Sequence, residues 1–93
     1  AAAQMVRVKR LVLDVLKPHQ PGAIEFGMSL ARQGGIRVKV TVVELDEKTE
    51  TLQVVVEGQD IDCERIQAAI GEFGASLHSV DEVEVMGEAE ESQ

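Results

Sequence analysis

The feature that most constrains the fold is a joint where a long apolar run meets two prolines. Residues 6–16, VRVKRLVLDVL, alternate and then become continuously apolar, which is typical of a strand buried on both faces near its end. Pro18 has no amide hydrogen and ends the hydrogen-bond ladder of that strand. Pro21 fits the first turn of a helix, where a backbone amide has no intrahelical partner. The joint therefore predicts a strand followed at once by a helix, with His19 between the two prolines.

The remaining elements are predicted from apolar periodicity and from glycine stops. Apolar residues at three-to-four spacing predict two helices, which end at the Gly34–Gly35 pair and at Gly74. Alternating β-branched residues predict three more strands. After the first strand, the expected elements are a helix at 24–33, a hairpin of strands 36–45 and 51–58 joined by residues 46–50, a helix that Asp60 or Asp62 caps, and a strand at 76–86.

The order βαββαβ leaves few arrangements, because connections are short and crossovers are right-handed. The favoured one is a ferredoxin-like α+β sandwich, with four antiparallel strands in the order 4-1-3-2 and both helices on one face. Residues 6–86 are expected to form this domain. Residues 1–5 are expected to be a flexible N-terminus, and residues 87–93, GEAEESQ, an acidic disordered tail.

Charge and cysteine content exclude several classes of function. The net charge of −8, with no Trp or Tyr, argues against nucleic-acid binding and disfavours an anionic membrane surface. No apolar stretch reaches the ~18–20 residues of a membrane span, and no signal peptide is recognised. Cys63 is the single cysteine, which leaves no disulfide or thiolate metal cluster. We expect a cytoplasmic protein with an inert thiol.

No catalytic constellation can be identified in the chain. Its serines have no G-x-S-x-G context, and neither a G-x-G-x-x-G segment nor a P-loop occurs. Because no nucleophile, base and orienting group can be named together, we expect no enzyme activity.

Strand alternation predicts which apolar side chains face away from the helices. The predicted outer apolar residues are Val12, Leu16, Val43, Leu45, Val55 and Val80. No further element is available to cover this face, and a domain of this length buries only about 60–65% of its unfolded surface. Uncovered apolar surface on so small a domain favours packing against another subunit. We therefore expect a homo-oligomer, with Val12, Val43, Val55 and Val80 as candidate interface residues.

The fold also brings the first joint, the hairpin turn and the start of the last strand to one end of the sheet. Ionisable side chains there are candidates for a divalent cation site, with Ca²⁺ or Mg²⁺ favoured over Zn²⁺. The candidate ligands are Asp14, His19, Glu44, Asp46, His78 and Asp81. The plainer alternatives are that His19 caps the helix or lies in solvent, that His78 fills a cross-strand pair, and that the hairpin acids are only solvated. A metal or small-molecule regulatory site, here or between subunits, is the second functional hypothesis, and the sequence does not identify the ligand.

Heavy-metal chaperone domains share this element order and carry a Cys-x-x-Cys at the corresponding joint. Here the joint reads KPHQPG and contains no cysteine. Transfer of soft metal ions is therefore excluded.

Three segments together resemble archaeal domain-of-unknown-function family 211. They are RLVLDVLKPHQP, VTVVELDEKTETLQVVVEG and LHSVDEVEV, and LDVLKPH is the most specific piece. The resemblance runs from about Met5 to Val85. It implies a ferredoxin-like fold, an archaeal cytosolic protein and a tendency to form cyclic homo-oligomers. It implies no activity, substrate or catalytic residue.

Overall fold

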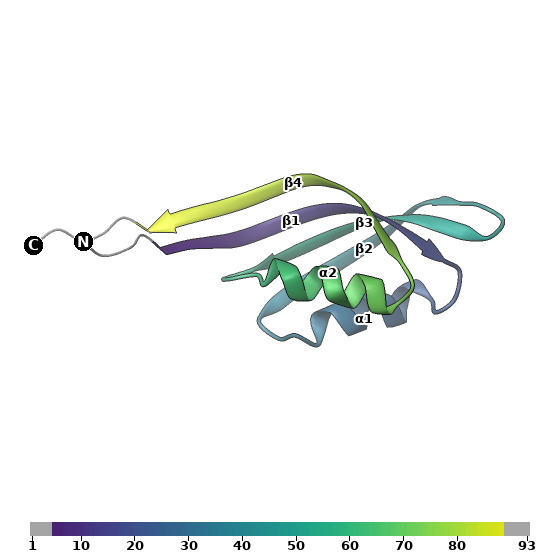
Figure 1. The fold of residues 1–93 in the computed structure, drawn as a ribbon, viewed down its shortest axis with the longest axis horizontal. Coiled ribbons are helices and arrows are strands. Elements are labelled where there is room, and N and C mark those ends of the chain that lie inside the picture. Colours follow the sequence, from purple (N-terminus) through teal and green to yellow (C-terminus); the bar gives the residue numbers. More distant parts are fainter. Residues whose placement is uncertain (1–4, 89–93) are drawn as a thin grey trace, which may run out of the picture.

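Within residues 5–88, which the computed structural model describes, the elements follow the predicted βαββαβ order (Figure 1). They are β1 (Met5–Pro18), α1 (Ala23–Ala31), β2 (Ile36–Leu45), β3 (Thr49–Gly58), α2 (Cys63–Glu72) and β4 (Ser76–Glu88). The sheet order is β2-β3-β1-β4, and every neighbouring pair is antiparallel. Counted from the other edge, this is the predicted order 4-1-3-2, which confirms the fold class.

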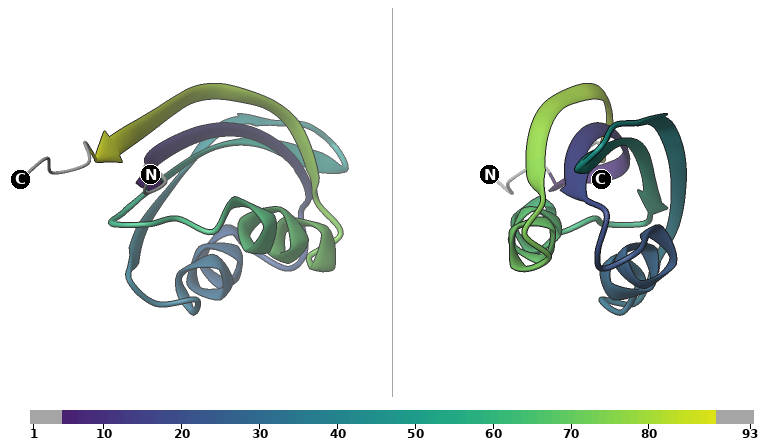
Figure 2. Two further views of the ribbon diagram at one scale, coloured as in Figure 1. Left: turned by 60° about the vertical axis from the view of Figure 1, so that its left-hand side comes forward. Right: turned by 90° about the vertical axis from the view of Figure 1, so that its right-hand side faces the viewer.

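Both helices lie on one side of the sheet, and the core fills the space between the two layers (Figure 2). Phe26 of α1 and Phe73 at the end of α2 meet edge to face, with their ring centroids 5.5 Å apart. The core residues are Leu11, Leu13, Val15, Phe26, Leu30, Leu52, Val54, Val56, Ile61, Ile66 and Ile70. We call the opposite side of the sheet the open face, because no helix within residues 5–88 covers it.

Capping contacts mark the start of both helices, and for α2 the capping residue is one of the two predicted. Asp62 caps α2, and its Oδ1 accepts a hydrogen bond from the Arg65 amide at 3.2 Å. The amide of Gly22, the residue before α1, donates to the Glu25 carboxylate at 3.2 Å. Pro21 therefore precedes the helix instead of lying in its first turn. In the described part of the chain, no helix is long and apolar enough to cross a membrane.

β2 spans the predicted residues 36–45, whereas the other three strands are longer than the sequence predicts. β1 and β4 continue as a two-stranded ribbon beyond the rest of the sheet, where Met5 pairs with Glu88 (Figure 1). The sequence places the end of the domain at residue 86, two residues earlier. β3 starts at Thr49, because the Asp46 amide donates to the Thr49 carbonyl at 2.8 Å and closes a shorter hairpin. The rest of the expected flexible N-terminus and acidic tail lies outside the described residues.

β-Bulges reverse the predicted face of two apolar residues. β4 is irregular beside Leu13, so that Val80 pairs with Leu13 and faces the helices. β2 is irregular at Val43, and beyond it Leu45 pairs with Glu50, which is at a helix-facing position. The predictions that Val80 and Leu45 lie on the outer face are therefore wrong, because each inserted residue inverts the alternation beyond it.

The open face exposes less apolar surface than predicted. Val12 is only 6% exposed, because it lies on a central strand between Val55 and Glu82. Val55 is half-buried, whereas Val43 is 63% exposed at its bulge. Val80 is 53% exposed, but on the helix side. Of the four candidate interface residues, Val43 and Val80 are the ones with most of their side chain uncovered.

Candidate functional site

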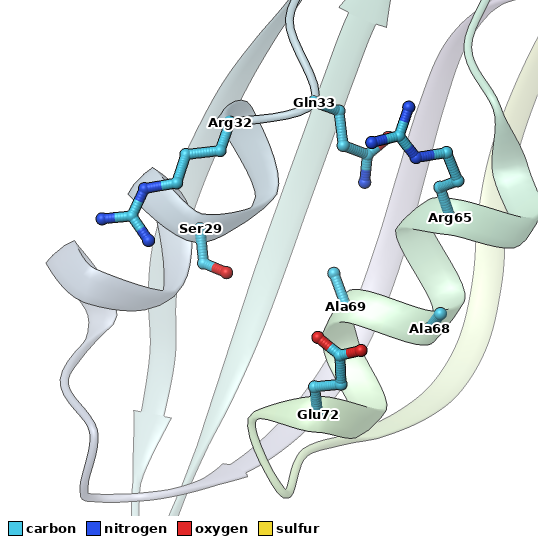
Figure 3. A pocket seen from close by; sticks show the side chains of 7 residues that line it. All are labelled: Ser29, Arg32, Gln33, Arg65, Ala68, Ala69 and Glu72. Atoms are coloured by element: carbon cyan, nitrogen blue, oxygen red, sulfur yellow. The ribbon is translucent and has the colours of Figure 1, made fainter.

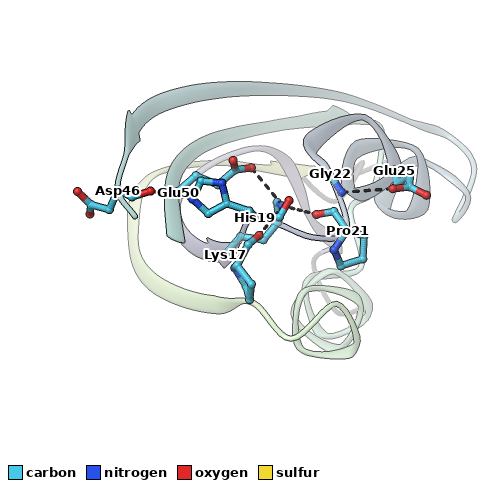
Figure 4. Close-up of polar contacts among 8 residues, drawn as sticks. Lys17, His19, Pro21, Gly22, Glu25, Asp46 and Glu50 are labelled. Carbon is cyan, nitrogen blue, oxygen red and sulfur yellow. Dashed lines mark hydrogen bonds and ion pairs between the residues drawn. The ribbon is translucent and has the colours of Figure 1, made fainter. Parts of the chain in front are cut away.

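A buried ion pair lies at the end of β1, beside the predicted joint (Figure 4). The Lys17 side chain is 0% exposed and the Glu50 side chain 10% exposed, and Lys17 Nζ lies 3.1 Å from Glu50 Oε1. The two residues are direct partners in the β1–β3 register. Each is two residues from a core residue of its own strand, Val15 or Leu52, and so shares the helix-facing side. The pair therefore closes one end of the core with charged groups.

Backbone carbonyls complete the surroundings of this ammonium group. Lys17 Nζ donates hydrogen bonds to the carbonyl oxygens of Pro18, at 2.8 Å, and of Pro21, and lies 3.5 Å from that of His19. Pro18 is the last residue of β1, and His19 and Pro21 belong to the connection between β1 and α1. We call Lys17, Glu50 and these carbonyls the Lys17 cluster. Within residues 5–88, no buried side-chain nitrogen or oxygen lacks a hydrogen-bond partner. The ammonium thus supplies the positive charge toward which the carbonyls converge.

His19 lies beside this cluster and contacts the hairpin. Its Nε2 is 2.7 Å from the carbonyl oxygen of Asp46. Because a carbonyl can only accept, the ring nitrogen is the donor. Figure 4 shows the carboxylate of Asp46 directed away from this contact. The predicted neighbours His19 and Asp46 do meet, but through the backbone of Asp46, as a structural link between the loop and the hairpin.

The other candidate metal ligands are spread over the sheet. Asp14 pairs with Gln53 and Ser79 in the register, and Glu44 pairs with Thr51. The Ser79 hydroxyl donates to Asp81 Oδ1 at 2.7 Å. His78 and Asp81 occupy the irregular positions of β4. Among residues 5–88, no three His, Cys, Asp or Glu side chains are grouped so that they could hold a metal ion. The described part of one chain therefore does not assemble the predicted cation site.

A groove of about 280 Å³ separates the two helices on the outside of the helical layer (Figure 3). Arg65 and Gln33 lie at one end of it and Glu72 at the other. Arg32 points away from α2. The charged side chains of this groove are exposed, so it contains no buried charge that a ligand would have to satisfy. The groove alone does not define a binding site.

Cys63 is the first residue of α2 and is partly buried. Burial, and then the negative charge of Asp62, raise the pKa of its thiol above the ordinary value. The thiolate fraction at neutral pH is correspondingly small, which agrees with the expected inert thiol.

Two rows of side chains cross the open face from edge to edge. Residues paired in an antiparallel register share a face and lie next to one another. The first row consists of Arg37 on β2, Glu57 on β3, Arg10 on β1 and Glu84 on β4. The second row consists of Lys39, Val55, Val12 and Glu82 on the same four strands. Each row begins with a cation on β2 and ends with a carboxylate on β4.

Arg10 connects the two rows at their centre. Its Nη1 lies 2.5 Å from Glu57 Oε2, and its Nε lies 2.8 Å from Glu82 Oε2. The hydrogen bonds to Glu82 and then to Glu57 raise the pKa of the guanidinium above its ordinary value. Arg37 Nη2 lies 3.7 Å from Glu57 Oε1. The sign of charge therefore alternates from β2 to β4 as positive, negative, positive and negative.

An apolar groove lies on the helix side of each sheet edge. The β2 groove, of about 360 Å³, is lined mainly by Ile24 and Met28 of α1 and by Val38 and Val40 of β2. The β4 groove, of about 180 Å³, is lined mainly by Leu13, Ile66, Leu77 and Val80. Each edge thus combines an unpaired strand, charged side chains on the open face and apolar side chains on the helix side.

The Lys17 cluster was not predicted from the sequence, although a signal for it exists. Lys17 continues the alternation of Leu13 and Val15, and Glu50 continues that of Leu52 and Val54. Two opposite charges at core positions of neighbouring strands are expected to pair, because a lone buried charge is costly. The β-bulges, in contrast, leave no comparable trace in the sequence.

Comparison with known proteins identifies the family of the chain. The model of domain-of-unknown-function family 211, described as "Uncharacterized ArCR", matches residues 9–91, a span that includes both rows and the Lys17 cluster. The chain is also similar to the "Uncharacterized protein MJ0319" of Methanocaldococcus jannaschii. The two are 40% identical over 77 residues, which cover 82% of this chain and 79% of the relative. The chain belongs to domain-of-unknown-function family 211.

Proposed function

We propose that the chain is a cytoplasmic, non-enzymatic module that assembles with copies of itself into a closed ring. One observation carries the proposal: within residues 5–88 both edges of the sheet are unpaired, and each has an apolar groove beside it. An open strand offers unpaired backbone groups to another strand, and apolar surface next to it favours burial. A domain this small also gains proportionally more stability from association than a large one.

The exposed apolar side chains gather along these edges. Ile24 and Met28 are more than half exposed beside β2, and Val80, Val83 and Val85 are more than half exposed along β4. Register pairing with the buried or half-buried side of β1 places Val83 and Val85 on the helix side as well. Covering these side chains is the main source of stabilisation that assembly would provide.

The Lys17 cluster supports a structural role for the joint of strand and helix rather than a catalytic one. Its ammonium is enclosed by Glu50 and the loop carbonyls, and its side chain is inaccessible to a substrate. A catalytic lysine would need an open path to a reacting group. The cluster instead holds the connection between β1 and α1 against the end of the sheet.

The proposal is tested by size-exclusion chromatography with light scattering on the wild type and on variants of the grooves. We expect a wild-type mass several times the 10.1 kDa of one chain. Ile24→Asn and Val83→Ser should each lower this mass, because they place polar groups in the covered surface. Leu16→Ser, an exposed apolar position away from both grooves, is the matched control and should leave the mass unchanged. A wild type that stays monomeric at tens of micromolar would overturn the proposal.

A further inference from the structure

We infer that neighbouring copies join head to tail, with the β4 edge of one protomer pairing antiparallel to the β2 edge of the next, so that both rows of side chains continue across the junction. The inference rests on the proposed self-assembly and specifies its partner surface. β2 and β4 are the edge strands, of 10 and 13 residues, and neither contains a proline. Each can therefore donate and accept the backbone hydrogen bonds of an added strand.

Charge on the open face selects the pairing of unlike edges. β2 presents Arg37 and Lys39 there, and β4 presents Glu82 and Glu84. A β4–β4 junction would set carboxylates against carboxylates, and a β2–β2 junction would set cations against cations. Only a β4–β2 junction brings opposite charges together. Two-fold dimers through either edge are thus disfavoured, and the contact joins two different surfaces.

The two rows also set the register of the junction. When the next copy is placed without any shift along the strand direction, Glu84 lies opposite its Arg37, and Glu82 lies opposite its Lys39. The alternation of positive and negative charge then continues into the next copy. Neither Lys39 nor Glu84 forms an ion pair within residues 5–88 of a single chain. One end of each row, Glu84 of the first and Lys39 of the second, is therefore available to a neighbour, whereas Arg37 and Glu82 already form ion pairs within the chain.

Strand direction permits this junction without reorienting either copy. Every neighbouring pair in the sheet is antiparallel, so β4 runs opposite to β2. Rotation about an axis parallel to the strands leaves the direction of every strand unchanged. The β2 strand of the rotated copy therefore lies antiparallel to the β4 strand of its neighbour. Repeating one such rotation closes a ring in which no sheet edge is left unpaired, as in a closed β-barrel.

The helix side of the junction joins the two apolar grooves. β4 of one copy carries Val80 and Val83 toward α1 of the next, which carries the exposed Ile24 and Met28. The junction then has charge pairs on the open face and apolar contact on the helix side. Apolar burial contributes most of the affinity, and the charges determine which edges pair and in which register.

Charge reversal provides the first test, by sedimentation velocity at low salt. Lys39→Glu and Glu84→Lys each set like charges across the junction and should weaken association about ten-fold or more. The double variant Arg37→Glu/Glu84→Lys keeps the net charge of the wild type, sets opposite charges across the first row of the junction again, and should recover the association that Glu84→Lys alone loses. Lys48→Glu in the hairpin connection and Glu72→Lys on α2 are the matched controls and should associate as the wild type does. Circular dichroism verifies that each variant is folded.

Cross-linking provides the second test, in a Cys63→Ser background. Arg37→Cys/Glu84→Cys should form a ladder of covalent oligomers on mild oxidation, because the two positions lie on opposite edges of one chain and adjoin only between copies. Lys48→Cys/Glu72→Cys should form none. Covalent dimers from Glu84→Cys alone would show a β4–β4 contact and overturn the inference. An oligomeric wild type that is insensitive to both charge reversals would overturn it too, while leaving self-assembly in place. A monomeric wild type would overturn the proposed function itself.

Discussion

Lys17 Nζ and Glu50 Oε1 lie 3.1 Å apart at the buried end of β1 and β3, and the same ammonium binds the carbonyl of Pro18 at 2.8 Å. One side chain thus links the end of a central strand, the start of β3 and the loop that leads into α1. A buried ion pair is only weakly stabilising when complete, but the loss of one partner leaves an uncompensated buried charge. The joint therefore depends on both residues together.

Lys17→Met should destabilise the fold by about 3–5 kcal/mol, because Glu50 would remain nearly buried without its cation. Urea unfolding at one fixed protein concentration measures the free energy. The double variant Lys17→Met/Glu50→Gln should recover part of the loss. Lys48→Met, an exposed lysine in the hairpin connection, is the control and should change stability by less than about 0.5 kcal/mol. Equal effects of the two lysine variants would refute the role of the pair.

His19→Ala should remove the hydrogen bond to the Asp46 carbonyl and cost about 0.5–1.5 kcal/mol of stability. Amide hydrogen exchange gives a sharper readout than global unfolding, because protection should fall in the hairpin connection and the β1–α1 loop and remain elsewhere. His78→Ala, at an exposed position of β4, should leave both regions unchanged. Unchanged exchange in the His19 variant would contradict the proposed link.

Cys63 should react with a disulfide reagent more slowly than a free cysteine at the same pH. Burial and the charge of Asp62 raise its pKa, so the midpoint of the pH–rate profile should lie above that of N-acetylcysteine. Asp62→Asn removes the charge but retains a good helix cap, and should move the midpoint downward. A midpoint below that of the free thiol would show that the dipole of α2 outweighs burial.

Calcium should not stabilise the chain beyond the effect of ionic strength, because the six candidate ligands do not come together within residues 5–88. CaCl₂ and NaCl at equal ionic strength should give the same melting temperature. Binding at a hundred times the Kd would add about 2.7 kcal/mol and raise it visibly. A rise specific to Ca²⁺ that is lost in His19→Ala would restore the hypothesis of a metal site.

The sequence predicts the fold well because its signals are local and agree with one another. Pro18 and the alternation before it define the end of β1, and Asp62 marks the start of α2. The order and direction of the strands follow from the few topologies that short connections allow. These features depend on each segment's own residues and hardly on the partner that it packs against.

The surface was predicted less well because it depends on pairing between strands. A single inserted residue in β4 moves Val80 to the helix side, and the alternation of the sequence does not reveal it. Val12 is covered by neighbours that the strand itself does not encode. The charge rows appear only when four strands are placed in register. The proposed interface therefore depends on how the strands pair in the folded sheet.

Sedimentation equilibrium of the wild-type chain at micromolar concentration tests the central claim most directly. We predict a single species whose mass is an integral multiple of 10.1 kDa, three or more, and does not grow with concentration, as a closed ring requires. A mass of one chain at every concentration would contradict self-assembly. A dimer, or a mass that rises without limit, would contradict the closed head-to-tail ring.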